Sequence, residues 1–380
     1  MTTDPVERRP RARDLGIRIG TLPPGPHNAI TDVAGVAVGH TTLVAGDGPL
    51  VVGQGPVRTG VTVILPRPAG AVADPLFAGA HVLNGNGEMT GLAWVAESGL
   101  LTTPIAITNT HSVGVVRDAL IAHAIAHGAH GEHPWSLPVV AETYDGTLSD
   151  INGMHVRPAH VDAALAGATA GPVPEGCVGG GTGMICHGFK GGIGTASRVV
   201  ALGDGAWTVG ALVQANHGQR RLLRIDGVPI GEAIPDSAVP TPRPASGPTP
   251  EPGGGSIIVV LATDAPLLPH QCRRLAQRAT IGVARVGGLG ENGSGDIFLA
   301  FATANRGLGA SDPAAPPVPV RMLPNPAMTP LFEAAAEATE EAIVNALCAA
   351  TTTVGIDGVT AHALPHDRLV EVMGRHRMRE

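Results

Sequence analysis

The chain has 380 residues, with 43% hydrophobic and 15% charged residues, 53 glycines and a formal net charge of −7. The apolar fraction is enough for a sizeable core, and the many glycines favour a compact, loop-rich α/β or α+β protein. Because no basic block accompanies the negative charge, a nucleic-acid partner is not expected.

The first residues carry no targeting signal that we recognise. Residues 1–14 are polar and arginine-rich without an apolar core, unlike a signal peptide. No apolar run reaches the ~18 residues of a membrane span. We therefore expect a disordered N-terminus over 1–12 and a cytoplasmic protein with no membrane partner.

Cysteine and histidine spacing predicts neither a metal site nor a disulfide framework. None of the four cysteines belongs to a C-x-x-C pair, so free and mostly buried thiols are expected. His123 and His127 are four residues apart, but no glutamate lies between them as in H-E-x-x-H metalloproteases. No cofactor is predicted.

Apolar runs with polar ends alternate with helical spacing in the first part of the chain. In chain order we predict a turn and strand over 29–40, a hairpin-like loop over 46–55, strands over 60–66 and 103–112, a helix over 113–127 and a strand over 138–146. Polar residues that follow a strand often line a site.

Tyr144 is the only tyrosine, and it lies at the polar end of a predicted strand between Glu142 and Asp145. A chain with 2% aromatic residues does not generally fill its core with rings, so this hydroxyl is a candidate for a specific role. The alternative is a tyrosine that only holds a loop, and the sequence leaves both open.

A glycine-rich zone over 179–195 precedes another strand with a polar end. The zone does not match a P-loop, because Lys190 is followed by Gly191 instead of serine or threonine, and close backbone packing is favoured. The strand over 208–218 ends at Asn216, whose amide is a candidate donor to an oxyanion. The alternative is an asparagine that closes a turn.

The most informative stretch joins a proline-rich segment to a buried strand. Seven prolines between 235 and 252 predict an extended, mobile linker, which ends in three glycines. Ser256 follows, and the apolar run 257–261 is typical of a strand buried on both faces. We interpret Ser256 as a nucleophile that first cleaves its own chain. The alternative is a linker between two domains that precedes an ordinary serine.

The remaining chain is predicted to be helical around one more strand. In order we expect a helix over 267–283, a loop over 287–295 that delivers Ser294 and Asp296, a strand over 297–302, a proline-rich connection over 304–326, a long helix to 351 with Thr329 as cap and Pro330 at its first position, and a short helix after Pro365.

Several blocks of this sequence resemble the L-aminopeptidase/D-esterase family, also called the DmpA-like or β-peptidyl aminopeptidase family. They are Arg13–Gly16, Asn28–Val36, Asn84–Gly91, Thr108–Gly114, Ala141–Gly146, Gly188–Gly194 and Gly255–Ile258. The resemblance implies a four-layer αββα sandwich, similar to N-terminal-nucleophile hydrolases but with different connectivity. It also implies one domain over 13–380, self-cleaved between Gly255 and Ser256 into an α chain (1–255, with a flexible tail over 233–255) and a β chain (256–380).

The resemblance assigns roles to individual residues. Ser256 matches the nucleophile, Tyr144 and Asn216 match the oxyanion positions, and Ser294 matches a serine that orients or relays to the nucleophile. Asp296 stands where the family can carry glutamate, and Glu142 resembles the acid that pairs with the substrate amine. Either the freed α-amine of Ser256 or the Ser294–Asp296 pair is then the base.

The implied activity is that of a serine aminopeptidase, amidase or esterase that releases N-terminal residues from small peptides, amides or esters. The family also implies a homo-oligomer of αβ units, expected to be a tetramer. Two other functions stay open at this point. One is an acyltransferase of the ornithine-acetyltransferase type, and the other is a binding scaffold that never processes itself.

Overall fold

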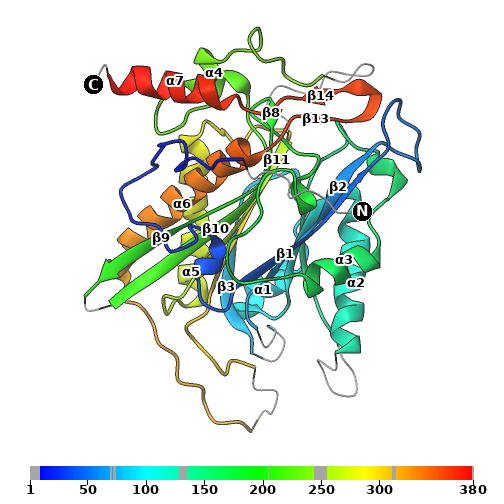
Figure 1. Ribbon diagram of the computed structural model, residues 1–380. Coiled ribbons are helices and arrows are strands. Elements are labelled where there is room, and N and C mark those ends of the chain that lie inside the picture. Colours follow the sequence, from blue (N-terminus) through cyan, green and yellow to red (C-terminus); the bar gives the residue numbers. More distant parts are fainter. Residues whose placement is uncertain are drawn as a thin grey trace.

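The apolar runs form two β-sheets that lie face to face, with helices on the outer side of each (Figure 1). The computed structural model describes residues 9–68, 71, 74–127, 135–203, 205–243, 255–309 and 314–378. In the part of the chain that it describes, no helix combines the length and apolar content needed to cross a bilayer.

The smaller sheet has four strands in the order β1-β2-β5-β6. Its strands are β1 (Ala37–Ala45), β2 (Val57–Leu65), β5 (Ile105–Asn109) and β6 (Val139–Thr143). Strands β1, β2 and β5 pair antiparallel, and β5 and β6 pair parallel. The polar ends of β5 and β6 therefore lie at the same edge of this sheet.

The larger sheet has six strands in the order β4-β3-β12-β11-β10-β9. They are β4 (Leu100–Leu101), β3 (Leu76–Gly85), β12 (Ser294–Ala302), β11 (Gly255–Thr263), β10 (Gly205–Asn216) and β9 (Gly192–Leu202). Strand β11 is central, antiparallel to β10 and parallel to β12. The buried run after Ser256 therefore becomes an interior strand, as its composition predicts.

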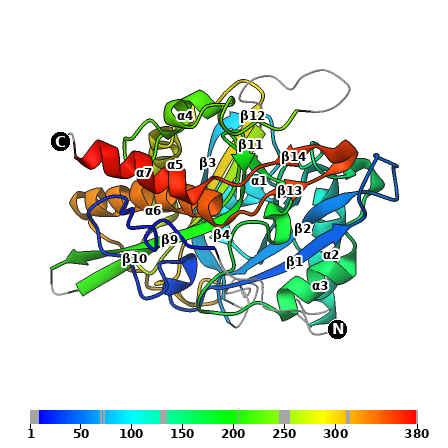
Figure 2. The same ribbon diagram turned by 45° about the horizontal axis from the view of Figure 1, so that its top comes forward.

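Helices cover the outer faces and the ends of the sandwich. Figure 2 shows α2 and α3 beside the smaller sheet, and α5 and α6 beside β9 and β10 of the larger sheet. The helices are α1 (Leu92–Ser98), α2 (Val113–Ala126), α3 (Pro158–Ala166), α4 (Ile230–Ala233), α5 (Pro269–Arg285), α6 (Met328–Ala349) and α7 (His366–Arg377).

Shorter elements complete the connections. Two small hairpins pair β7 (Ile185–Cys186) with β8 (Phe189–Lys190) and β13 (Thr353–Val354) with β14 (Thr360–Ala361). The 3-10 turns are η1 (Ile30–Asp32), η2 (Thr110–Ser112), η3 (Ile151–Gly153), η4 (Gly179–Gly181), η5 (Arg220–Leu222), η6 (Asn325–Ala327) and η7 (Ile356–Gly358).

Alternation along β11 divides its side chains between two cores. Ile257, Val259 and Leu261 pack with the helix-covered core that contains α5 and α6. Ile258 and Val260 instead pack in the core between the two sheets. Successive strand residues point to opposite faces, so both faces of this strand are buried. A third core lies between the smaller sheet and helices α2 and α3, and these three stacked cores confirm the predicted four-layer αββα arrangement.

Two predicted boundaries of disorder differ from the structure. Arg9 donates to the carbonyl oxygens of Ala350 and Leu364, and Ala12 is fully buried, so residues 9–12 belong to the folded chain. The polar composition of this segment led to the prediction of disorder, because the sequence does not show that Arg9 reaches carbonyl groups more than 300 residues away. Residues 1–8 lie outside the described residues.

The tail predicted over 233–255 is also packed at its beginning. Ala233 ends α4, Ile234 is fully buried, and Thr241 donates to Asp236 at 2.5 Å. Residues 244–254 lie outside the described residues. The prolines of 235–242 thus follow a defined path along the protein, which proline content alone does not exclude.

The start of the long helix differs by two residues from its prediction. Helix α6 begins at Met328 with Ala327 in the capping position, and no side chain caps it. Thr329 and Pro330 lie within its first turn, where proline lacks only an N–H that would have no intrahelical partner.

A buried ion-pair network ties the N-terminal segment to α6 and β9. Arg198 is fully buried and pairs with Glu337 at 2.8 Å and Glu341 at 2.7 Å. Glu341 also pairs with Arg13 at 2.7 Å and accepts from Asn28 at 2.5 Å. Glu341 therefore compensates two arginines at once, and these partners hold the pKa of its carboxyl below the usual value despite burial.

Replacing Glu341 with Gln is expected to destabilise the fold by about 3–5 kcal/mol, because Arg198 loses a buried counter-charge. Urea denaturation monitored by circular dichroism measures this change. Glu371→Gln is the matched control, since it removes only an exposed pair with Arg375 and is expected to cost less than about 0.5 kcal/mol. Equal stabilities of the two variants would contradict a structural role for the network.

Candidate active site

Ser256 lies at the start of the central strand and faces the space between the sheets. It is the second residue of β11 and shares its side-chain parity with Ile258 and Val260, which belong to the core between the sheets. The side chain is buried, and its Oγ accepts a hydrogen bond of 3.1 Å from the backbone N–H of Gly295. The hydroxyl of Ser256 is thus held in place at the start of the strand. Because its oxygen accepts this hydrogen bond, its own proton stays available for transfer.

Asn216 is the neighbour of Ser256 on the adjacent strand. The two residues are direct partners in the antiparallel register of β10 and β11. Asn216 Oδ1 accepts from the N–H of Ile185 at 2.8 Å, and its Nδ2 donates to the carbonyl of Tyr144 at 3.0 Å. These bonds fix which way the amide points. Its second N–H has no acceptor among the described residues and remains available to a ligand.

A cavity of about 1030 Å³ opens beside these residues and contains most of the predicted site. Ser256, Asn216, Tyr144 and Glu142 all line it. Tyr144 is 49% exposed and comes from the end of β6 in the other sheet. The structure therefore brings together four predicted site residues from three separate parts of the sequence, by stacking the ends of two sheets.

Glu142 is a buried carboxylate held in a defined orientation. Its Oε1 accepts from the backbone N–H of Glu88 at 2.9 Å, and its Oε2 accepts from the hydroxyl of Thr110. Burial raises the pKa of this carboxyl, while the two hydrogen bonds oppose that shift. A cation that reached this oxygen pair would stabilise the ionised form.

Ser294 and Asp296 form a pair on the other face of the sheet. Ser294 donates to Asp296 Oδ1 at 2.7 Å, and neither residue lines the cavity. Along β12, Phe298 and Ala300 with the same parity belong to the helix-covered core. The pair lies beside the backbone of Gly255, the register partner of Ser294, and Gly255 lines the cavity although the two side chains do not.

Asp296 is a carboxyl group that resists ionisation. It is almost fully buried, and burial raises its pKa to about 6, while Glu291 raises it further and Ser294 opposes the shift. A hydrogen bond from the N–H of Ile257 also lowers the pKa and places the carboxyl next to the backbone of β11. This group therefore changes charge near neutral pH, within contact of the strand that carries Ser256.

Some groups that position the site residues could not be predicted from the sequence, because they are backbone N–H groups. The N–H groups of Gly295 and Ile185 hold Ser256 and Asn216, and no residue type in the sequence marks such a donor.

The glycine-rich zone surrounds a buried lysine. Lys190 is fully buried, and its Nζ donates to the carbonyls of Gly181, Met184 and Gly191. The glycine-rich zone thus packs closely around a lysine, which agrees with the favoured interpretation and not with a phosphate loop.

Comparison with known proteins places these observations in a family. A model of peptidase family S58 matches residues 28–361. The chain is 51% identical over 373 residues to the β-peptidyl aminopeptidase BapA of Sphingosinicella microcystinivorans, covering 97% of this chain and 93% of that protein. Among solved structures, a Burkholderia sp. β-aminopeptidase matches with a TM-score of 0.87 and 57% identity over 96% of this chain and 99% of the other.

A second solved structure carries a description of its fold. The L-aminopeptidase D-Ala-esterase/amidase of Ochrobactrum anthropi matches with a TM-score of 0.87 and 46% identity, covering 97% of this chain and 99% of that one. It is described as a prototype of the serine aminopeptidases and as a new variant among the Ntn hydrolase fold. The predicted resemblance to N-terminal-nucleophile hydrolases is confirmed.

The raised pKa of Asp296 predicts a fall in stability as pH rises from 4 to 7. The unfolded carboxyl ionises near 3.9 and the folded one near 6, so between these values the folded state binds more protons and loses stability with rising pH. The loss amounts to about 3 kcal/mol for a shift of about two pKa units. Asp296→Asn is expected to lack this part of the decline.

Urea denaturation of both proteins at pH 4 and pH 7 measures the difference. Because other carboxyl groups change equally in the two proteins, only the wild-type decline in excess of the variant's decline reports Asp296. Identical pH dependence in the two proteins would show that this carboxyl ionises normally in the folded state.

Proposed function

The chain belongs to peptidase family S58 and is a serine aminopeptidase of that family, and from this premise we propose that Ser256 is its nucleophile. One observation carries the proposal: a buried serine hydroxyl at the start of the central strand opens on the cavity opposite Asn216 and accepts a backbone N–H. A nucleophile on a rigid strand, with donors fixed around it, is what acyl transfer needs.

The same hydroxyl is proposed to cleave the bond between Gly255 and Ser256. Ser256 Oγ attacks the carbonyl carbon of Gly255, the peptide nitrogen leaves as the α-amine of Ser256, and the resulting ester is hydrolysed by water. This yields an α chain of 1–255 and a β chain of 256–380 within one domain. Glycine at 255 fits the reaction, because a Cβ there would lie 2.0 Å from the carbonyl oxygen of Asn216.

The freed α-amine is the base that the geometry favours. Its reference pKa is about 7.7–8.0, so a fraction is neutral at pH 7 and accepts the Oγ proton of the same residue. The Ser294–Asp296 pair lies beside the β11 backbone on the opposite face from Oγ. We assign the pair to orienting this amine and adjusting its charge, rather than to contacting the hydroxyl.

In turnover, Ser256 attacks the carbonyl that follows the first residue of the substrate. The free N–H of Asn216 and the hydroxyl of Tyr144 are the proposed donors to the oxyanion. Loss of one such donor typically lowers kcat by ~10²–10³. Departure of the amine or alcohol leaves an acyl-enzyme, and water then releases the N-terminal residue, which restores the Ser256 hydroxyl.

Glu142 is the proposed partner of the substrate ammonium group. It lines the same cavity as Ser256, and both of its oxygens are positioned by Glu88 and Thr110. An ion pair at a buried carboxylate selects substrates with a free amine. The substrate class is therefore small peptides, amides or esters with a free N-terminus, and the names of the relatives add β-peptides to this class.

The assembled protein is proposed to be a homo-oligomer, with a tetramer of αβ units as the expected form. Several large apolar side chains lie exposed on the described surface, including Val82 and Leu83 of β3 and Leu289 in the neighbouring loop. Trp94 and Trp135 pack edge to face with ring centroids 5.9 Å apart while remaining exposed. Exposed apolar groups of this kind support burial between copies.

Replacing Ser256 with Ala is expected to abolish both self-cleavage and aminopeptidase turnover, because one oxygen performs both attacks. Intact mass under denaturing conditions, with N-terminal sequencing of any smaller species, measures the first effect. The wild type is expected to give a chain that begins Ser-Ile-Ile-Val, and the variant a single uncut chain. A variant that still splits at Gly255 would sink the self-cleavage proposal.

Replacing Glu142 with Gln is expected to raise KM for substrates with a free amine by about 10- to 100-fold, because a charge-assisted contact worth roughly 1.5–3 kcal/mol is lost. Initial rates on a β-alanyl p-nitroanilide measure the effect. Glu97→Gln, an acidic residue that does not line the cavity, is the control. An unchanged KM in the Glu142 variant would assign amine recognition to another group.

A further inference from the structure

A cysteine and two histidines meet directly beneath the active-site cavity. Cys186 ends β7, His187 follows it, and His217 follows the last residue of β10. All three are buried, and one possible ligand atom from each lies within 4.8 Å of the others. Cys186 Sγ and His217 Nδ1 are 3.9 Å apart. The sequence predicts no metal site, because about thirty residues separate the two halves of this cluster.

The two imidazoles present unused nitrogen atoms. Nε2 of His187 and Nε2 of His217 are buried and have no hydrogen-bond partner among the described residues. The Nδ1 of His187 lies 3.1 Å from the carbonyl oxygen of Gln219, which fixes its hydrogen on Nδ1 and leaves the lone pair on Nε2. An imidazole that binds a metal ion does so as the neutral ring, through the nitrogen that carries no hydrogen.

The distances between the three possible ligand atoms suit one metal ion, and their chemical types suit an ion of soft character. Bonds of roughly 2.0–2.3 Å from one ion to sulfur and nitrogen place the ligand atoms about 3.3–3.8 Å apart. His217 meets this spacing through its Nδ1, which lies 3.9 Å from Cys186 Sγ, so its hydrogen is then carried on Nε2. A movement of about 1 Å by one side chain therefore completes a three-ligand set. One thiolate and two imidazoles are ligands that favour Cu⁺ and Zn²⁺.

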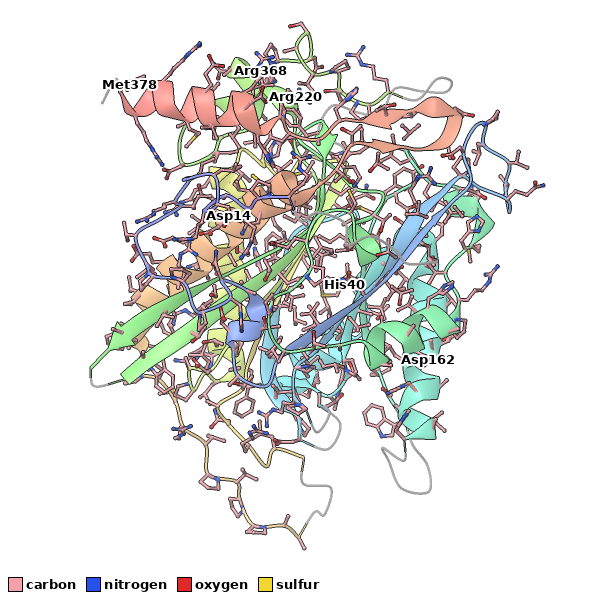
Figure 3. All side chains as sticks on the ribbon, in the orientation of Figure 1. Asp14, His40, Asp162, Arg220, Arg368 and Met378 are labelled. Carbon is pink, nitrogen blue, oxygen red and sulfur yellow. The ribbon has the colours of Figure 1, made fainter. Side chains whose placement is uncertain are left out.

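Charge decides between these two ions. The guanidinium of Arg220, labelled in Figure 3, donates to the carbonyl of His187, and Lys190 lies close enough to affect the Cys186 thiol. Cu⁺ with one thiolate and two neutral imidazoles gives a site of zero net charge. Zn²⁺ would leave a positive charge beside two cations and would need a fourth ligand, which the three side chains do not supply.

We propose that Cys186, His187 and His217 form a three-coordinate Cu⁺ site beneath the floor of the active-site cavity. Binding replaces the thiol proton of Cys186 by a sulfur–copper bond and releases that proton to solvent, while each histidine donates a lone pair and no electron is transferred.

The cavity provides the route to this site. Gly218 lines the cavity, and a Cβ at this position would lie 2.3 Å from Cε1 of His187. Only a glycine without a side chain therefore separates the imidazole from the cavity. An ion that enters the active site meets the cluster after a small displacement of the 217–219 backbone.

Occupancy is expected to inhibit the enzyme through Asn216, a step that rests on the proposed role of this residue. The N–H of His187 donates to the carbonyl of His217 at 2.7 Å, and the N–H of Ile185 donates to Asn216 Oδ1 at 2.8 Å. Drawing Cys186 and His217 toward one ion moves both strand ends that orient the Asn216 amide. Displacing an oxyanion donor lowers kcat by at least about tenfold.

Anaerobic titration with Cu⁺ against a chromophoric Cu⁺ chelator tests the site. The processed wild type is expected to bind one Cu⁺ per chain, with one sulfur and two nitrogen ligands by X-ray absorption. Cys186→Ser and His187→Gln are each expected to lose this ion, and Cys177→Ser, which changes a half-buried thiol outside the cluster, is expected to keep it. Activity without copper shows that each variant is folded.

The possible results distinguish the claim that Cu⁺ binds at this cluster from the claim that bound Cu⁺ inhibits the enzyme. Binding that survives in Cys186→Ser, or that disappears in Cys177→Ser, overturns the site. Zn²⁺ that binds more tightly than Cu⁺ overturns the charge argument that selects the ion. Cu⁺ that binds at Cys186 in the wild type without lowering kcat overturns only the coupling through Asn216.

Discussion

The pairing of β11 with its two neighbours is the constraint on which the site depends. The register of β10 against β11 sets Asn216 opposite Ser256, and the register of β12 sets Gly295 beside it. Side chains alternate between faces, so a shift of one residue would turn Ser256 away from the space between the sheets. The six buried residues that follow it, 257–262, oppose such a shift, because each fills one of two cores.

The two faces of this sheet carry different groups of the proposed reaction. The face toward the smaller sheet carries the hydroxyl of Ser256 and the amide of Asn216, and the end of β6 supplies Tyr144 and Glu142 across the cavity. The opposite face carries the carboxyl of Asp296 beside the β11 backbone. The α-amine that self-cleavage would free at Ser256 belongs to the backbone, so it lies between the two faces and can contact groups on both. A side chain on the strand points to one face only.

The sequence predicted the elements whose residue types carry the signal, and it failed where geometry carries it. The glycines before Ser256 and the apolar run after it are local features, so the strand and the place of Ser256 at its start could be predicted. Tyr144 was conspicuous because it is the only tyrosine. The face of the sheet on which Asp296 lies depends on the register of β12, which the sequence does not give. The donor at Gly295 is a backbone N–H, so no side chain in the sequence indicates it.

Buried cations in this region donate mainly to backbone carbonyl groups, and the one ion pair with a carboxylate that Arg220 makes among the described residues, to Asp236, is long at 3.9 Å. Lys190 donates to three backbone carbonyls, and Arg220 donates to those of His187, Gly188, Ile234 and Val239. Each cation thereby ties loops together without pairing with Glu142 or Asp296. Burial lowers the pKa of both, to about 10 for Arg220.

The acids of the site are left without such partners as a result. Burial raises the pKa of Glu142, of Asp145 to about 7 and of Asp296 to about 6, because hydrogen bonds from neutral groups do not offset the loss of water. A lysine or arginine beside any of them would fix it as a carboxylate at all working pH values. With Lys190 and Arg220 held by other groups, Glu142 has no lysine or arginine partner among the described residues, as its proposed role toward a substrate ammonium group requires, and Asp296 can change charge beside the backbone of Ser256.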